Sequence, residues 1–144
     1  MAQATSDDAA VLAANDAFYR AFESLEIDRM RALWLPSGPI TCIHPGWNAL
    51  VGWPDVMESW EEIFAGTLGM RFTLSEITVR VVGDAAWVLC VEEIETREVD
   101  GRTEARVQAT NVFERRDGRW WIVHHQGGPL IGPRTRIAGS SPLQ

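Results

Sequence analysis

Apolar positions in the first half of the chain recur at steps of three and four residues, the spacing of one helix face. One such stripe runs from Val11 to Phe22, with polar residues on either side of it. Ser, Asp and Pro, which favour the first turn of a helix, stand at the start of each apolar stripe. The pattern predicts three helices, which start after Ser6, at Asp28 and at Pro54.

From residue 70 onward, apolar and polar positions alternate, which is typical of strands in a sheet. The alternation changes phase near Ser75-Glu76, and this change predicts a β-bulge. A further short strand over residues 40–44 precedes the third helix and stops at Pro45-Gly46, since proline cannot donate to a strand ladder. Three turn signals separate four long strands: Gly83-Asp84, Asp100-Gly101 and Asp117-Gly118.

Helices followed by an antiparallel meander predict an α+β fold in which the helices cover one face of the sheet. A chain of 144 residues is long enough to bury a sizeable core, and no repeat or linker divides it. We therefore expect a single domain over residues 1–130. The stretch 131–144 is rich in Gly, Ser and Pro, and we expect it to form a flexible tail.

The charge balance narrows the classes of function. The formal net charge of −7 disfavours binding to nucleic acid or to an anionic membrane surface. All thirteen basic residues are Arg, so Schiff-base chemistry and pyridoxal-phosphate anchoring, which need Lys, are excluded. Cys42 and Cys90 lie in apolar stretches and are expected to be buried, reduced thiols. With no visible signal peptide and no apolar run of about 20 residues, a cytoplasmic location is expected.

Polar residues interrupt the apolar rows of the predicted strands. If strict alternation holds, the interruptions share one face of the sheet, and His44 joins them at the end of its short strand. We predict that they line one cavity, with Trp34, Trp47 and Trp60 as apolar ligand contacts. The polar members of this cavity are His44, Glu92, Asn111, His124 and Gln126.

Each of these residues also has a simpler structural interpretation. Asn111 and His124 could be hydrogen-bonded core residues, and Glu92 could mark the point where its strand leaves the core. Trp34 and Trp60 could fill the core instead of holding a ligand. No metal-binding spacing, phosphate-binding loop or dinucleotide fingerprint occurs, so neither a metal nor a cofactor is expected.

The order of elements resembles the NTF2-like superfamily, a cystatin-like α+β roll shaped like a cone, over about residues 7–130. Four stretches are similar to its SnoaL-like branch: residues 40–47, 83–88, 109–113 and 118–125. The resemblance implies three helices on a curved, mainly antiparallel sheet. It does not fix an activity, because the superfamily includes isomerases, cyclases, dehydratases and non-enzymatic assembly domains.

The steroid-isomerase branch of this superfamily has a catalytic Asp followed by Pro at the end of the same short strand. The corresponding dipeptide here is His44-Pro45, which makes His44 a candidate general base. Those enzymes also use a Tyr on the first helix as oxyanion donor. Phe18 is expected in that register and Tyr19 is expected to turn away, so steroid isomerisation itself is disfavoured.

Two hypotheses remain open. In the first, the protein binds a small apolar or aromatic molecule in its cone, with His44 and His124 as catalytic residues of a cofactor-free isomerase, cyclase or dehydratase. In the second, it is a non-catalytic binding or assembly domain whose pocket is filled by side chains. An open cavity reached by both histidines would favour the first, and a cavity filled by Trp would favour the second.

The outward row of the last strand predicts an interface. Trp121, Val123 and His125 share that row. The same face carries Thr110 and Val112 on the expected neighbouring strand, and Trp87, Leu89 and Val91 on the strand Ala85 to Arg97. A contiguous apolar patch on a protein surface usually marks a contact with another chain. Because related cone-shaped proteins pair through the convex face of the sheet, we expect a homodimer through this face.

Overall fold

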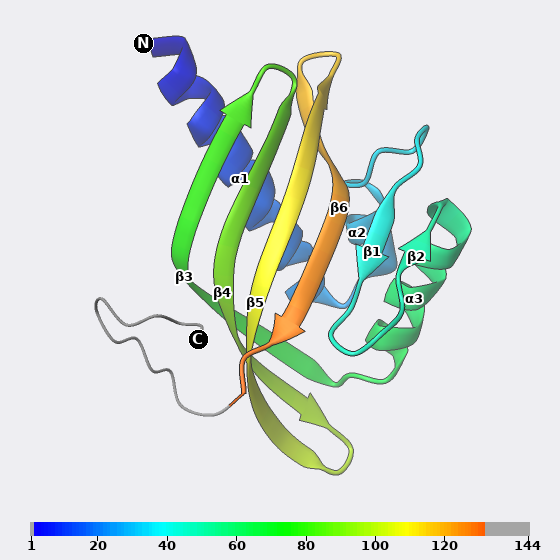
Figure 1. The fold of residues 1–144 in the computed structure, drawn as a ribbon. Helices are drawn as coiled ribbons and strands as arrows, with labels where there is room; N and C mark the ends of the chain where they lie inside the picture. Colours follow the sequence, from blue (N-terminus) through cyan, green and yellow to red (C-terminus); the bar gives the residue numbers. More distant parts are fainter. Residues whose placement is uncertain (1, 132–144) are drawn as a thin grey trace.

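The computed structural model describes residues 2–131, and the side chains of residues 6–131. Figure 1 shows the helices on one side of a curved sheet. The elements in chain order are α1 (Ala2–Ser24), α2 (Ile27–Arg31), β1 (Thr41–Ile43), β2 (Leu50–Val51), α3 (Trp53–Ala65), β3 (Gly69–Val82), β4 (Ala85–Glu98), β5 (Gly101–Arg116) and β6 (Arg119–Pro129).

The strands form one open sheet in the order β2-β1-β6-β5-β4-β3. All neighbouring pairs are antiparallel except β1 and β6, which run parallel. The long helix α1 lies across the inner face of the sheet, while α2 and α3 lie beside β1 and β2 (Figure 1). The predicted α+β fold, with helices packed on a mainly antiparallel sheet, is confirmed.

Aromatic side chains fill the space between α1 and the sheet. Phe18 contacts four of the other rings edge-on at centroid distances of 4.9 to 6.4 Å. Rings in this geometry place their positive edges against negative faces, which adds to the gain from burial. The buried aromatic residues are Phe18, Tyr19, Phe22, Trp34, Trp60, Phe64, Phe72, Phe113 and Trp120.

Several local predictions can be checked directly. All three hairpin turns occur where they were expected. The bulge is also confirmed, because the pairing of β3 with β4 shifts between Ser75 and Thr78 and Glu76 adopts a φ of 51°. Helix α1 begins at Ala2, so the expected start after Ser6 is wrong. The short strand β2 was not predicted, and the expected tail over 131–144 lies outside the described residues, apart from Ile131.

A second bulge, in β6, was missed. Val112 pairs with His124 while the next residue, Phe113, pairs with Ile122, so Val123 is an extra residue on β6. An extra residue exchanges the two faces for the rest of the strand. Trp120 and Ile122 are buried as predicted, but beyond the bulge it is His125 that is buried, and Gln126 is exposed.

None of the helices in the described part of the chain is both long enough and apolar enough to cross a membrane.

Candidate functional site

A buried hydrogen-bond network joins α1 to the three strands β4, β5 and β6. The hydroxyl of Tyr19 donates to Oε2 of Glu92 at 2.5 Å. Nδ2 of Asn111 donates to the Tyr19 hydroxyl at 3.1 Å and to Oδ1 of Asn15 at 2.9 Å. His125 completes the network, with Nδ1 at 2.6 Å from Oδ1 of Asn111. All five side chains are buried, so their polar atoms depend on one another.

Burial within the network shifts the pKa values of its members. Burial raises the pKa of Glu92 to about 7, and the hydrogen bond from Tyr19 partly offsets this rise. The pKa of Tyr19 is raised well above its usual value by burial and by the nearby Glu92 carboxylate. Burial lowers the pKa of His125 to about 3, so its ring is neutral near pH 7. Because the amide oxygen of Asn111 only accepts, His125 carries its proton on Nδ1.

His44 lies just after β1 and forms a separate contact with α3. Its Nε2 is 2.9 Å from Oγ of Ser59, whose hydroxyl donates to the carbonyl of Val56 at 2.6 Å. Ser59 therefore accepts from His44, which places the imidazole proton on Nε2. Burial lowers the pKa of His44 to about 4, so this ring too is neutral near pH 7. The ring is enclosed by Trp60 and Trp47, with centroids 4.8 and 4.9 Å away.

The three predicted tryptophan contacts differ in position. Trp34 and Trp60 are fully buried in the aromatic core, and Trp47 is exposed beside His44. The indole nitrogens of Trp34 and Trp60 are the two buried side-chain nitrogen or oxygen atoms without a hydrogen-bond partner in the described part of the chain. The inside of the cone is therefore packed by side chains around His44.

His124 and Gln126 do not join the other predicted site residues. The prediction that they face the interior is wrong, because the bulge at Val123 turns them to the outer face of the sheet. His124 is partly buried there, with Nδ1 at 2.6 Å from Oγ1 of Thr41, and it lines a shallow pocket of about 180 Å³. His44, two residues beyond Cys42, faces the interior, so the two proposed catalytic histidines lie on opposite faces.

Tyr19, Asn15 and His125 are the members of the network that the sequence prediction missed. Tyr19 was expected to turn away and His125 to face outward, and both expectations are wrong. Asn15 and Tyr19 are four residues apart on α1, so they share a helix face that points at β4 and β5. This spacing was the available signal, together with the polar breaks at Glu92 and Asn111.

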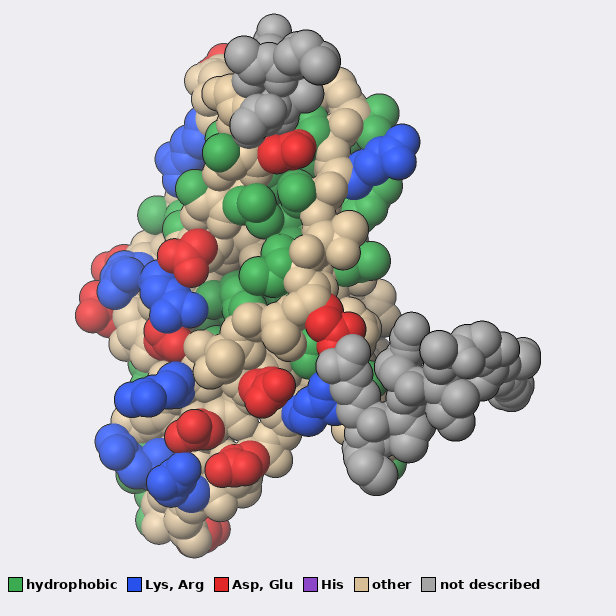
Figure 2. Space-filling view, turned by 90° about the vertical axis from the view of Figure 1, so that its left-hand side faces the viewer, with side chains coloured by type: hydrophobic (Ala, Val, Ile, Leu, Met, Phe, Trp, Pro, Cys, Tyr) green, Lys and Arg blue, Asp and Glu red, His purple; other side chains and the backbone are tan. Residues whose placement is uncertain are grey.

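An apolar groove leads to the network. It lies between α1 and β3, has a volume of about 310 Å³, and has Asn15 among its lining residues. Figure 2 shows hydrophobic side chains gathered along the middle and upper part of the face that contains α1 and β3. The remaining lining residues are Leu12, Asp16, Leu74, Ile77 and Val79.

Among residues 2–131, no three His, Cys, Asp or Glu side chains are close enough together to hold a metal ion. Cys42 and Cys90 are buried, free thiols whose pKa values burial raises. For Cys90 the pKa rises to about 11, so a reactive thiolate near neutral pH is disfavoured.

The open, curved sheet with helices on its inner face is the cystatin-like α+β fold, which solved structures of similar architecture share. Within this fold class the chain belongs to the SnoaL-like domain family, whose model matches residues 11–132.

Several solved structures are similar to this chain, including two that are at least 30% identical to it. One is a candidate dehydratase of the NTF2-like family from Streptomyces avermitilis, with 34% identity, a TM-score of 0.84, and coverage of 89% of this chain and 99% of that one. The other is a candidate association domain of a calcium/calmodulin-dependent protein kinase type II from Thiobacillus denitrificans. It is 30% identical, has a TM-score of 0.74, and the match covers 83% of this chain and 94% of that one.

The F-box protein SKIP8 of Arabidopsis thaliana is also similar, with 30% identity over 122 residues, which is 85% of this chain. The chain spans about half the length of this curated relative, 50%.

Proposed function

We propose that the protein binds a small, largely apolar molecule carrying one polar group, and that the groove between α1 and β3 is its site. The main support for this proposal is the groove itself. It has a volume of about 310 Å³ and is lined mainly by aliphatic side chains, together with the polar side chain of Asn15. A concave apolar site with few polar groups is typical of small-molecule binding.

The buried network supports this proposal by holding Asn15 in place. Oδ1 of Asn15 accepts from Asn111, so the amide has a defined orientation. Asn111 is itself held by Tyr19 and His125. Asn15 is buried and already bonded to Asn111, so it gives the otherwise aliphatic groove one polar position of fixed orientation, which favours a ligand with a single matching polar group.

Beyond binding, the protein could also catalyse an acid/base reaction on its ligand. The similarity to a candidate dehydratase favours this more specific proposal. Glu92, with a pKa of about 7, is the side chain best tuned to exchange a proton near neutral pH. Neither Glu92 nor Tyr19 is among the residues that line the groove, whereas Asn15 is. We therefore assign the pair to positioning Asn15, and a catalytic role for His44 stays a prediction.

The groove is tested with 1-naphthol, an apolar molecule with one hydroxyl group. Ile77→Asn places an amide in the groove at a side chain that is 47% exposed, so the fold should tolerate it. We expect this change to weaken binding about tenfold, the effect of losing roughly 1.4 kcal/mol of apolar contact. The matched control is Val82→Asn, on the same strand but outside the groove and similarly exposed, which should bind as the unchanged protein does.

The polar contact is tested separately by comparing 1-naphthol with naphthalene. If Asn15 recognises the hydroxyl group, Asn15→Ala should weaken 1-naphthol binding and reduce its advantage over naphthalene. Equal binding of the two molecules to the unchanged protein would refute the polar contact. Equal binding of 1-naphthol to the Ile77 and Val82 variants would refute the groove.

A non-catalytic assembly domain is the second candidate. The aromatic packing inside the cone favours it, as does the similarity to a candidate association domain. Trp87 and Leu89 are both 38% exposed on the outer face of β4, where a second chain could cover them.

A further inference from the structure

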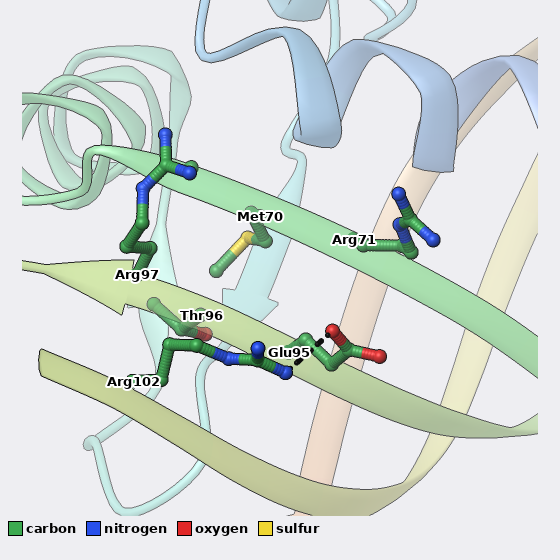
Figure 3. Close-up of a pocket in the computed structure, with 7 residues that line it drawn as sticks. Met70, Arg71, Glu95, Thr96, Arg97 and Arg102 are labelled. Atoms are coloured by element: carbon green, nitrogen blue, oxygen red, sulfur yellow. Dashed lines mark hydrogen bonds and ion pairs between the residues drawn. The ribbon is translucent and has the colours of Figure 1, made fainter.

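A pocket rich in arginine lies far along the sheet from the groove, where β3 begins and the β4–β5 hairpin extends beyond the body of the protein (Figure 1). Its volume is about 350 Å³. Figure 3 shows its charged side chains around the paired strands. The lining residues are Gly69, Met70, Arg71, Glu95, Thr96, Arg97 and Arg102.

The charge of this pocket is opposite to that of the chain. Three guanidinium groups and one carboxylate line it, whereas the whole chain has a formal net charge of −7. Arg102 pairs with Glu95 at 3.1 Å and is 3.8 Å from Glu104, so the single acid of the pocket is already neutralised. Within the described residues, Arg71 and Arg97 make no ion pair or side-chain hydrogen bond.

Gly69 makes room for one of these two guanidinium groups. A Cβ atom at this position would lie 3.1 Å from Nη2 and 3.4 Å from Cζ of Arg97. Gly69 and Arg97 are also direct partners in the pairing of β3 with β4. The absence of a side chain therefore lets the Arg97 guanidinium lie against the β3 backbone, within the pocket (Figure 3).

We propose that this pocket binds a phosphate dianion, free or as part of a phosphorylated small molecule. Two uncompensated guanidinium groups match two negative charges, and their planar N–H groups suit the oxygens of a phosphate group. The neighbouring pocket adds Glu93 and Glu104 against one arginine, Arg106, so its lining is less favourable to anions and the site is confined to the Arg97 side.

The test is a titration with inorganic phosphate at pH 8, followed by the backbone amide signals of the protein in two-dimensional NMR at constant ionic strength. We expect saturable shifts at Gly69, Met70 and Arg97, and weaker shifts with acetate, a monoanion. Arg97→Gln should weaken phosphate binding about tenfold, since it removes one charge-assisted contact. Arg80→Gln is the matched control, because it removes the same charge from the neighbouring strand β3 at a position outside the pocket.

Gly69→Ala distinguishes phosphate recognition by a correctly placed Arg97 side chain from general attraction by positive charge. The added methyl group displaces the flexible end of Arg97 without changing any charge, so it should weaken phosphate binding while the fold stays intact. Shifts that do not saturate, or equal losses in the Arg97 and Arg80 variants, would overturn the site. Acetate binding as tightly as phosphate would overturn the preference for a dianion.

Discussion

Glu92 is a carboxyl group that the fold keeps partly protonated near pH 7, because burial raises its pKa to about 7. Its pKa is about 7 in the folded protein, against 4.5 for the unperturbed group, so folding raises it. A raised folded pKa means that the stability linked to Glu92 is complete below about pH 4.5 and is lost as pH rises through about 7. His44 and His125 act oppositely, since their lowered pKa values cost stability as pH falls below about 6.5.

The first prediction follows from this sign. Glu92→Gln replaces the carboxyl group with an uncharged amide of similar shape. The variant should therefore lack the loss of unfolding free energy that ionisation of Glu92 causes in the unchanged protein between pH 5 and pH 8. The difference between the variant and the unchanged protein should grow by about 3 kcal/mol over that range. Urea denaturation at several pH values measures it. Glu93→Gln, at the exposed next position, should show no such growth.

A second prediction concerns the donor to Glu92. Tyr19→Phe leaves the buried carboxyl without its hydrogen-bond donor and Asn111 without one of its acceptors. We expect the free energy of unfolding to fall by about 1–3 kcal/mol. The pKa of Glu92 should also rise, because the Tyr19 hydrogen bond lowers it. Carbon-13 NMR of the Glu92 carboxyl group measures the pKa, and an unchanged value would contradict the hydrogen bond.

At the scale of elements, the sequence predicted the fold better than the site. Turn residues and apolar spacing act locally, and they predicted all three hairpins and the bulge at Glu76. The faces of β6 depend on one extra residue, Val123, in a stretch whose apolar and polar pattern shows no break at that point. His44, Glu92 and Asn111 are therefore buried as expected, although His44 lies outside the network of the other two. His124 and Gln126 were placed on the wrong face.

The third prediction tests the packing of β6. A Cβ atom on Gly127 would lie 2.9 Å from Cγ1 of Val107 and 3.3 Å from Cγ of Pro45, whereas one on Gly128 would meet nothing within 4 Å. Gly127→Ala should therefore reduce the free energy of unfolding by about 1–3 kcal/mol through overpacking. Gly128→Ala should leave it within about 0.5 kcal/mol. Equal effects, measured by urea denaturation, would refute the tight approach at Gly127.

At the scale of the whole molecule, the outer face of the sheet remains the proposed dimer interface. His125 is not part of that face, but Trp121 and Val123 are partly buried on it and Trp87 and Leu89 are exposed there. A stable interface of this kind buries about 1,200–2,000 Å² in total. This requires a contiguous area that spans β4, β5 and β6.

The fourth prediction tests this interface. Trp121→Glu and Leu89→Glu should each convert a dimer to a monomer in light scattering, because each places a charge within the contact. Leu89 is the safer site, since Trp121 also contacts Arg119, whose Cζ is 3.8 Å from the indole centroid. Val99→Glu, in the exposed turn between β4 and β5, is the control and should stay dimeric. An unchanged protein that is monomeric at tens of micromolar would refute the interface.

The bulge at Glu76 has a consequence for how the protein behaves at high concentration. The sheet ends on β3, a strand of 14 residues, while its other end is the two-residue β2. A long, flat outer strand invites the strands of other molecules to add to it and to propagate into aggregates. The left-handed backbone at Glu76 and the shifted register around it break this edge into two shorter, twisted segments. A broken edge of this kind disfavours the addition of further strands along β3.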